Sequence, residues 1–168
     1  MQSGELFISN RDGVHQIRVT GKATFECAPG LRNFAKSLEL DTYKSIRIDL
    51  RECVWMDSTF MGILAMIGLH AKKVGAEVAI LNAGPQNTAL LCGLGLKKLF
   101  KFEDTAESGS AGERKADDKA ESALDSARMV LDAHETLMNV DEGNVRKFNG
   151  VVDLVRKDIE KQDGTQKS

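Results

Sequence analysis

Residues 46–74 constrain the fold more than any other stretch, because their hydrophobic period changes once, at a polar turn. From Ile46 to Leu50 apolar and polar residues alternate, which is the two-residue period of a strand. After Asp57 and Ser58 the apolar residues recur at helical spacing instead. The sequence therefore predicts a strand that leads directly into a helix, with Asp57, Ser58 and Thr59 in the first helical turn.

The start of this helix has two properties that bear on function. Either Asp57 or Ser58 suits the N-cap, because a short side-chain oxygen can accept from the free N–H groups of the first turn. The same place is the positive end of the helix dipole, where a phosphate group is stabilised. Gly75, after two lysines, predicts a left-handed end to the helix. A hydroxyl group at the helix start can therefore serve as a switch.

Strands and helices are expected to alternate on both sides of this unit. Asp12-Gly13 predicts a hairpin turn, Thr20-Gly21 is expected to break the second strand, and Pro29 suits the first position of a helix. The expected order is two strands at 6–8 and 14–19, a helix from 29 to about 40, the strand and helix of 46–74, a strand at 78–81, a helix opened by residues 84–85 and ended by Gly95, and a last short strand or edge segment at 96–102. This order predicts an α/β fold with a mixed β-sheet, because strands separated by helices are parallel.

The composition changes after Phe102. Residues 104–112 contain no large apolar side chain and are interpreted as a linker between a domain at 1–103 and a helical extension at 113–168. Two stripes in the extension have alternating three- and four-residue steps, and they consist of Ala120, Leu124, Ala127, Leu131, His134 and Met138, and of Val145, Phe148, Val152, Val155 and Ile159. They predict a C-terminal α-helical hairpin, with a break near 139–144.

Composition excludes several classes of protein. A net charge of −2 argues against nucleic acid as the main partner, and no apolar run approaches the length of a membrane span. The N-terminus lacks the basic and apolar regions of a signal peptide, so a soluble, cytoplasmic protein is expected. Cys27, Cys53 and Cys92 match no zinc or redox spacing, and we interpret them as free, buried core cysteines. We expect neither a metal nor a cofactor.

Catalysis finds no support in the pattern of polar residues. His15, His70 and His134 have no neighbouring serine, aspartate or cysteine in an arrangement typical of a triad. Gly62 and Gly68 lie inside the helix after Ser58, where small residues permit close packing more often than they bind phosphate. A non-enzymatic protein is therefore expected.

Three motifs give the chain a family resemblance from Glu5 to Phe102. They are IDLRECVWMDST, VTGKATFE and GPQNTALLCGLGLKKLFKF. The chain resembles the STAS family, the sulfate transporter and anti-sigma factor antagonist domains. The resemblance implies a STAS-like mixed β-sheet with helices packed against it. The helical extension is not part of the usual single-domain antagonist.

The resemblance also implies a regulatory role. In antagonists of this family, the serine that follows the aspartate is phosphorylated by a kinase that also binds the sigma factor, and a phosphatase reverses the modification. Here that serine is Ser58. Phe60 stands where the family usually has glycine, and Thr24 replaces an acidic residue. The expected switch and partner surface consists of Thr24, Asp57, Thr59, Phe60 and Met61.

Other interpretations remain open at this point. Ser58 is also explained by helix capping alone, and Trp55 and Phe60 can be core residues or anchors for a partner. The same surface could bind constitutively in a scaffold or a transport-associated subunit, or the domain could sense a small ligand or nucleotide. Self-association through the C-terminal helices would make the chain a homo-oligomer.

Overall fold

The computed structural model describes residues 3–106, 112–117, 119–120 and 122–166. Its elements follow in the order β1 (Glu5–Arg11), β2 (Val14–Ala23), α1 (Ala28–Ser37), η1 (Leu38–Leu40), β3 (Ser45–Met56), α2 (Ser58–Val74), β4 (Glu77–Leu81), α3 (Pro85–Gly93), η2 (Leu96–Leu99), β5 (Lys101–Glu103), β6 (Arg114–Lys115), α4 (Ala123–Val140) and α5 (Gly143–Gln166).

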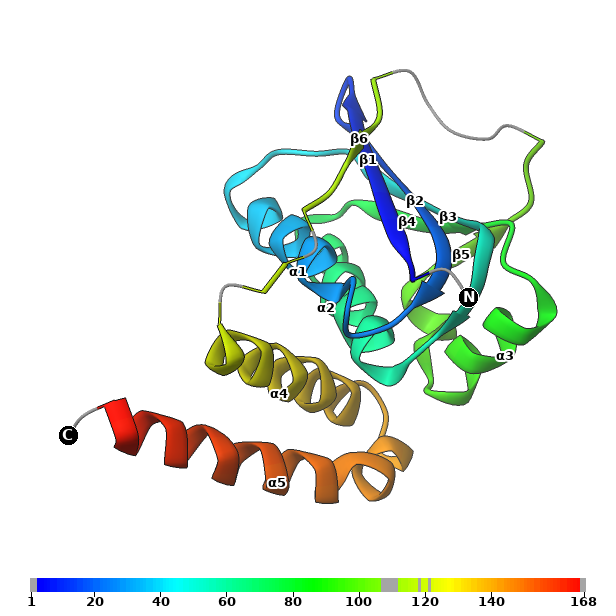
Figure 1. The fold of residues 1–168 in the computed structure, drawn as a ribbon. Coiled ribbons are helices and arrows are strands. Elements are labelled where there is room, and N and C mark those ends of the chain that lie inside the picture. The colour runs from blue at the N-terminus through cyan, green and yellow to red at the C-terminus, as the bar shows by residue number, and fades with distance from the viewer. Residues whose placement is uncertain (1–2, 107–111, 118, 121, 167–168) are drawn as a thin grey trace.

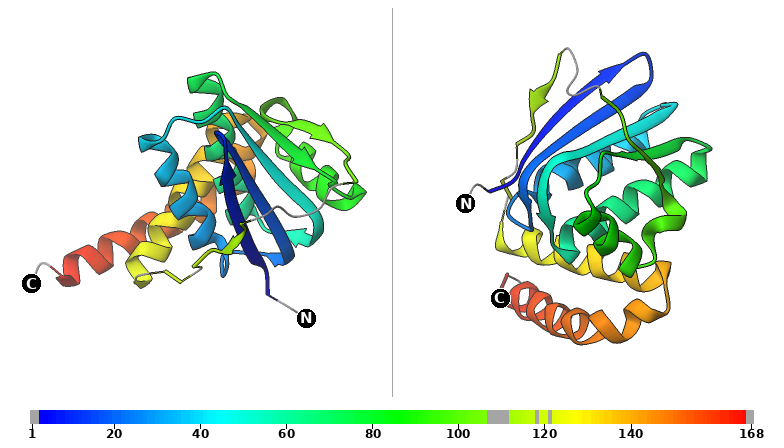
Figure 2. Two further views of the ribbon diagram at one scale, coloured as in Figure 1. Left: turned by 90° about the horizontal axis from the view of Figure 1, so that it is seen from above. Right: turned by 90° about the vertical axis from the view of Figure 1, so that its right-hand side faces the viewer.

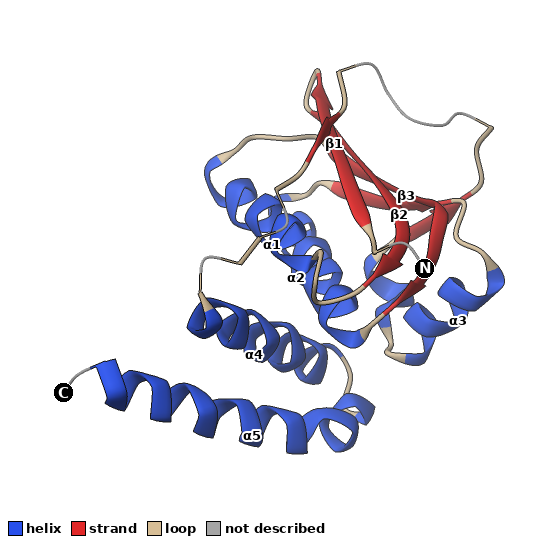
Figure 3. Cartoon of the chain, in the orientation of Figure 1, coloured by secondary structure: helices blue, strands red, loops and turns tan. Residues whose placement is uncertain are grey.

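The strands form one mixed sheet in the order β5-β4-β3-β2-β1-β6. β1 is antiparallel to both β2 and β6, whereas β2, β3, β4 and β5 run parallel to one another. α1 and α2 lie side by side along one face of the sheet, as Figure 1 shows. The long strand β3 occupies the middle of the sheet and delivers the chain straight into α2 (Figure 3). The α/β mixed sheet expected from the sequence is confirmed. The last strand expected at 96–102 is shorter than predicted, because Leu96–Leu99 form the 3-10 helix η2 and only β5 (Lys101–Glu103) pairs in the sheet.

The residues of the turn explain the first hairpin, but the second strand of the hairpin is longer than expected. Asp12 and Gly13 have φ angles of 53° and 82°, which a two-residue hairpin turn of this kind requires. β2 was expected to break at Thr20-Gly21, but it continues to Ala23 beside β3. Gly21, with φ 71°, lies where the register between β2 and β3 shifts. The glycine therefore allows a bulge in a paired strand instead of ending it.

The start and end of α2 follow the sequence closely. The helix ends at Gly75, whose φ of 76° and ψ of 19° are left-handed, and the Gly75 N–H donates to carbonyls in the last turn. Gly68 also serves the expected role, since a Cβ there would lie only 3.0 Å from the Phe100 ring. Gly68 thus permits close packing of α2 against the segment that contains Leu99 and Phe100.

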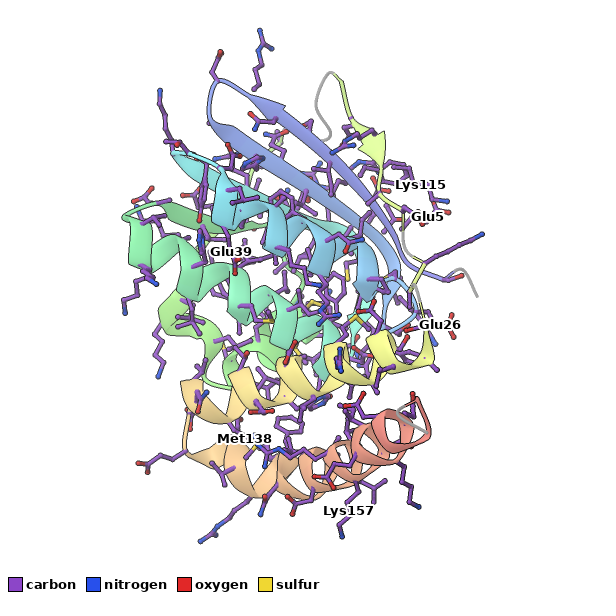
Figure 4. All side chains as sticks on the ribbon, turned by 90° about the vertical axis from the view of Figure 1, so that its left-hand side faces the viewer. Glu5, Glu26, Glu39, Lys115, Met138 and Lys157 are labelled. Carbon is purple, nitrogen blue, oxygen red and sulfur yellow. The ribbon has the colours of Figure 1, made fainter. Side chains whose placement is uncertain are left out.

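The segment before the C-terminal helices adds a strand that was not expected. β6 pairs with the edge strand β1, and the Nζ atom of Lys115 lies 3.9 Å from the Glu5 carboxylate (Figure 4). The helices accordingly begin at Ala123 and not at Glu113. Most of the expected linker, residues 107–111, falls outside the described residues. The division into domain, linker and extension stays a prediction.

The two C-terminal helices form the expected hairpin and lie outside α2 in successive layers (Figure 2). α4 contacts α2 on one side and α5 on the other. Its most buried residues form a face slightly rotated from the expected stripe, and they are Met129, Ala133, His134, Leu137 and Val140. The rotation follows from this double contact, because α4 has to bury one face against the domain and another against α5. Within the described residues, no helix is long and apolar enough to cross a membrane.

Candidate functional site around Ser58

Asp57 fixes the turn between β3 and α2. Its backbone is extended, its Oδ1 accepts from the Phe60 N–H at 2.8 Å, and its Oδ2 accepts from the Phe25 N–H at 2.8 Å. The first bond caps the helix, and the second ties the loop after β2 to the same carboxylate. Of the two N-cap candidates, Asp57 is therefore the cap, and the hydroxyl group of Ser58 is not needed for it.

Ser58 instead contacts a residue 76 positions further along the chain. Its Oγ lies 2.8 Å from Nε2 of His134 on α4, and Nδ1 of the same imidazole lies 2.7 Å from the Val130 carbonyl oxygen. Because a carbonyl oxygen can only accept, Nδ1 carries a proton. In the neutral imidazole this leaves Nε2 as the acceptor for the Ser58 hydroxyl group. His134 is 4% exposed and Ser58 is half-buried, so water has only partial access to this hydrogen bond.

Thr24 lies in the loop that Asp57 fixes. Its hydroxyl oxygen accepts from the Glu26 N–H at 3.3 Å, and its carbonyl oxygen accepts from the Cys27 N–H at 3.1 Å. Thr24 is half-buried, like Asp57 and Ser58. The structure thus places Thr24 in the loop beside the Ser58 turn, and its contact with a partner stays a prediction.

The three residues after Ser58 are placed differently from Thr24. Thr59, Phe60 and Met61 are 6%, 0% and 4% exposed, and Phe60 and Met61 belong to the main hydrophobic core. Of the two interpretations of Phe60, core packing is the one that the structure shows. These side chains shape the Ser58 surface from beneath, and their direct contact with a partner stays a prediction.

α4 packs against α2 at Gly62, where there is no room for a side chain. A Cβ on Gly62 would collide with the Ala133 carbonyl oxygen and would lie 2.7 Å from the Ala133 Cβ. Gly62 is one helical turn after Ser58, on the side of α2 that faces α4. The Ser58–His134 hydrogen bond and the Gly62–Ala133 contact therefore belong to one helix crossing.

A buried arginine connects α1 to the same helix. Arg32 is 7% exposed, and its two terminal nitrogens donate to the carboxylates of Asp125 and Asp132 at 3.1 and 3.0 Å. The remaining guanidinium nitrogen, Nε, is buried without a hydrogen-bond partner. The guanidinium charge is thus balanced by two carboxylates of α4, which makes α4 a polar as well as an apolar partner of the domain.

Sequence reasoning missed both polar contacts of α4. His134 was the one ionisable residue in an otherwise apolar stripe, and a polar residue at such a position indicates a buried partner. Arg32 gave a weaker signal, within the apolar face of α1. Neither signal could identify the partner, because Ser58 and the two aspartates lie far away in the sequence. Among the described residues, no group of three or more His, Cys, Asp or Glu side chains could hold a metal ion.

Comparison with known proteins identifies the family of the domain that carries this site. The model of the STAS domain family matches residues 8–109, which is more than half of the chain. The chain belongs to the STAS domain family. The matched region contains the sheet except β6 and residues 5–7 at the start of β1. It includes Ser58, but it ends before α4 and α5.

Individual relatives agree with this assignment. A "STAS-domain containing protein" of Pseudomonas aeruginosa is 23% identical over 86 residues, which are 51% of this chain and 84% of that protein. Unphosphorylated SpoIIAA, an anti-sigma factor antagonist, matches with a TM-score of 0.54 and 16% identity over 61% of this chain and 89% of its own. An anti-sigma factor antagonist from Mycobacterium paratuberculosis matches with a TM-score of 0.54 and 24% identity, over 62% and 88% of the two chains. These structures share the STAS fold with the present chain.

Proposed function

We propose that this STAS protein is a non-enzymatic regulatory module of the anti-sigma factor antagonist type, which acts in the cytoplasm. A protein partner binds at the Ser58 turn, and reversible phosphorylation of Ser58 controls that binding. The partner we propose is an anti-sigma factor with serine kinase activity, and a phosphatase restores the hydroxyl group.

One observation carries the proposal: Asp57 caps α2 through its own carboxylate, so the Ser58 hydroxyl group is free of any capping role. A phosphate on Ser58 would add about −1.5 to −2 charges at pH 7. The N-terminus of a 17-residue helix favours that charge, while the Asp57 carboxylate opposes it. The domain can therefore accept the modification without losing the helix start, as a reversible switch requires.

The comparisons support the proposal at the level of the fold. SpoIIAA has solved structures in an unphosphorylated and a phosphorylated form, and both match this chain, with TM-scores of 0.54 and 0.53. A fold of this kind thus tolerates phosphate in that protein. For the present chain, phosphorylation and the partner rest on the position of Ser58.

The proposal is tested by affinity capture from the native cell with four chains at equal folded concentration: wild type, Ser58→Ala, Ser58→Asp and Ser126→Ala. Ser126 is a half-buried serine on α4 and serves as the matched control. We expect Ser58→Ala to retain the partner and Ser58→Asp to lose it, because new charge and bulk at the contact weaken binding tenfold for each 1.4 kcal/mol or so. The control should behave as wild type. Equal yields from all four chains would contradict the switch and favour a constitutive scaffold.

A further inference from the structure

The surface that the proposed partner needs is already in use within the chain. α4 crosses α2 at the Ser58 end, where His134 takes the Ser58 hydroxyl group and Ala133 lies against Gly62. Met129, Ala133 and Leu137 of α4 are at most 2% exposed, so α4 covers apolar surface as well as the hydroxyl group. A partner that binds around Ser58 and α4 in this position would occupy the same space.

We propose that α4 is a cis-acting cover of the Ser58 face, which has to leave before a protein partner can bind there. This inference rests on the proposed function for the identity of the face, but the cover itself is a property of the chain. α4 competes with the partner, and the observed state is the closed one. When α4 leaves the Ser58 face, α5 moves with α4, because the two helices pack together.

Three features indicate that the cover is separable from the domain. The STAS family model ends at residue 109, and SpoIIAA matches over 89% of its own length within 61% of this chain, so the fold is complete without a counterpart of α4. The contact includes the polar pairs of Ser58 with His134 and of Arg32 with two carboxylates, which water can replace after release. The last feature is Gly62, where the three atoms nearest to an added Cβ all belong to Ala133 of α4.

Gly62 also offers a variant that acts directly on the contact between α2 and α4. In Gly62→Ala the new Cβ meets the backbone of Ala133, which cannot rotate away as a flexible side chain could. α2 itself should gain stability, because alanine is a better helix former than glycine. Gly150→Ala on α5 is the matched control, since a Cβ there meets nothing within 4 Å.

The test is hydrogen–deuterium exchange, measured by mass spectrometry on the full chain for wild type and both glycine variants. We expect Gly62→Ala to raise the exchange rate of residues 123–140 and of the first turn of α2 by about tenfold or more, because both lose their cover. Strand β3 should keep its protection, and Gly150→Ala should match wild type. His134→Ala is a second opening variant, which leaves α2 unchanged and should act in the same direction.

Two results would overturn the cover. If both opening variants leave α4 as protected as in wild type, α4 is not held at this crossing. If β3 loses protection together with α4, then α4 is an inseparable part of the domain core.

The partner found with Ser58→Ala adds the functional readout, and it should bind Gly62→Ala at least about tenfold more tightly than Gly150→Ala. Equal affinities would contradict the competition. If Ser58→Asp captures as much partner as wild type, the phosphate switch is refuted. The hydrogen–deuterium exchange of α4 would then still show whether α4 covers the Ser58 face.

Discussion

Removing the Ser58 hydroxyl group should destabilise the chain through α4 and not through the helix cap. In Ser58→Ala, Asp57 still caps α2, but Nε2 of His134 loses its donor in a site that is 4% exposed. An unsatisfied buried acceptor costs about 1–3 kcal/mol. In a chain of this length each kcal/mol lowers the melting temperature by about 2–4 °C, so we expect a decrease of roughly 2–12 °C.

A double-mutant cycle assigns this cost to the hydrogen bond. We would measure the free energy of unfolding in urea for wild type, Ser58→Ala, His134→Ala and the double variant, by circular dichroism and by the fluorescence of Trp55, the single tryptophan. The double variant should be more stable than the sum of the single effects predicts, by about 0.5–1.5 kcal/mol, because the shared hydrogen bond is counted twice in that sum.

The control for the cycle combines Ser58→Ala with His70→Ala. His70 lies twelve residues further along α2, about 18 Å away at 1.5 Å per residue, and it hydrogen-bonds Tyr43. These two changes should add to within about 0.5 kcal/mol. If the effects of Ser58→Ala and His134→Ala on the free energy of unfolding were equally additive, the Ser58–His134 hydrogen bond would contribute nothing to stability. This result would contradict the proposed role of the hydrogen bond in holding α4 against α2.

Two further predictions concern neighbouring groups. Asp57→Ala should lower the free energy of unfolding by about 1–2 kcal/mol, because the helix cap is lost. Asp153→Ala, at an exposed position of α5, should change the free energy of unfolding by less than about 0.5 kcal/mol. Urea titration measures both variants, and equally small effects would refute the capping role of Asp57. Burial raises the pKa of the Cys53 thiol to about 11, so at pH 8 only about one molecule in a thousand carries the reactive thiolate. Cys92 was expected to be buried, but it is exposed, so iodoacetamide should modify it first in the native chain. Equal labelling of Cys53 and Cys92, mapped by mass spectrometry, would show that the Cys53 site opens.

Local patterns predicted the elements of the domain because their signals lie within a few residues. The change of period at Asp57, the Asp12-Gly13 turn and the glycine at 75 each act on the backbone next to them, and the structure confirms all three. The expected break at Gly21 was wrong, because pairing with β3 holds the strand beyond the glycine. A long-range contact therefore overrode a local preference.

The candidate site was predictable only in part. The Ser58 turn follows from its strand, its cap and the helix after it, and these are neighbours in sequence. The hydrogen-bond partner of Ser58 could not be predicted from neighbouring residues, because His134 belongs to a helix whose docking depends on tertiary packing against Gly62. A histidine in an apolar stripe indicates that a buried partner exists, but it does not say where. The direction of α4 across α2 is therefore information that only the structure supplies.

The most direct test of the account is the phosphate occupancy of Ser58 in the chain isolated from its native cells. Quantitative mass spectrometry of the peptide that contains Ser58 would compare wild type with the same sample after phosphatase treatment. We expect phosphate on Ser58 in a fraction that changes when the captured kinase is removed, with no comparable change at Ser126. Ser58 without phosphate under every condition that changes partner binding would contradict it.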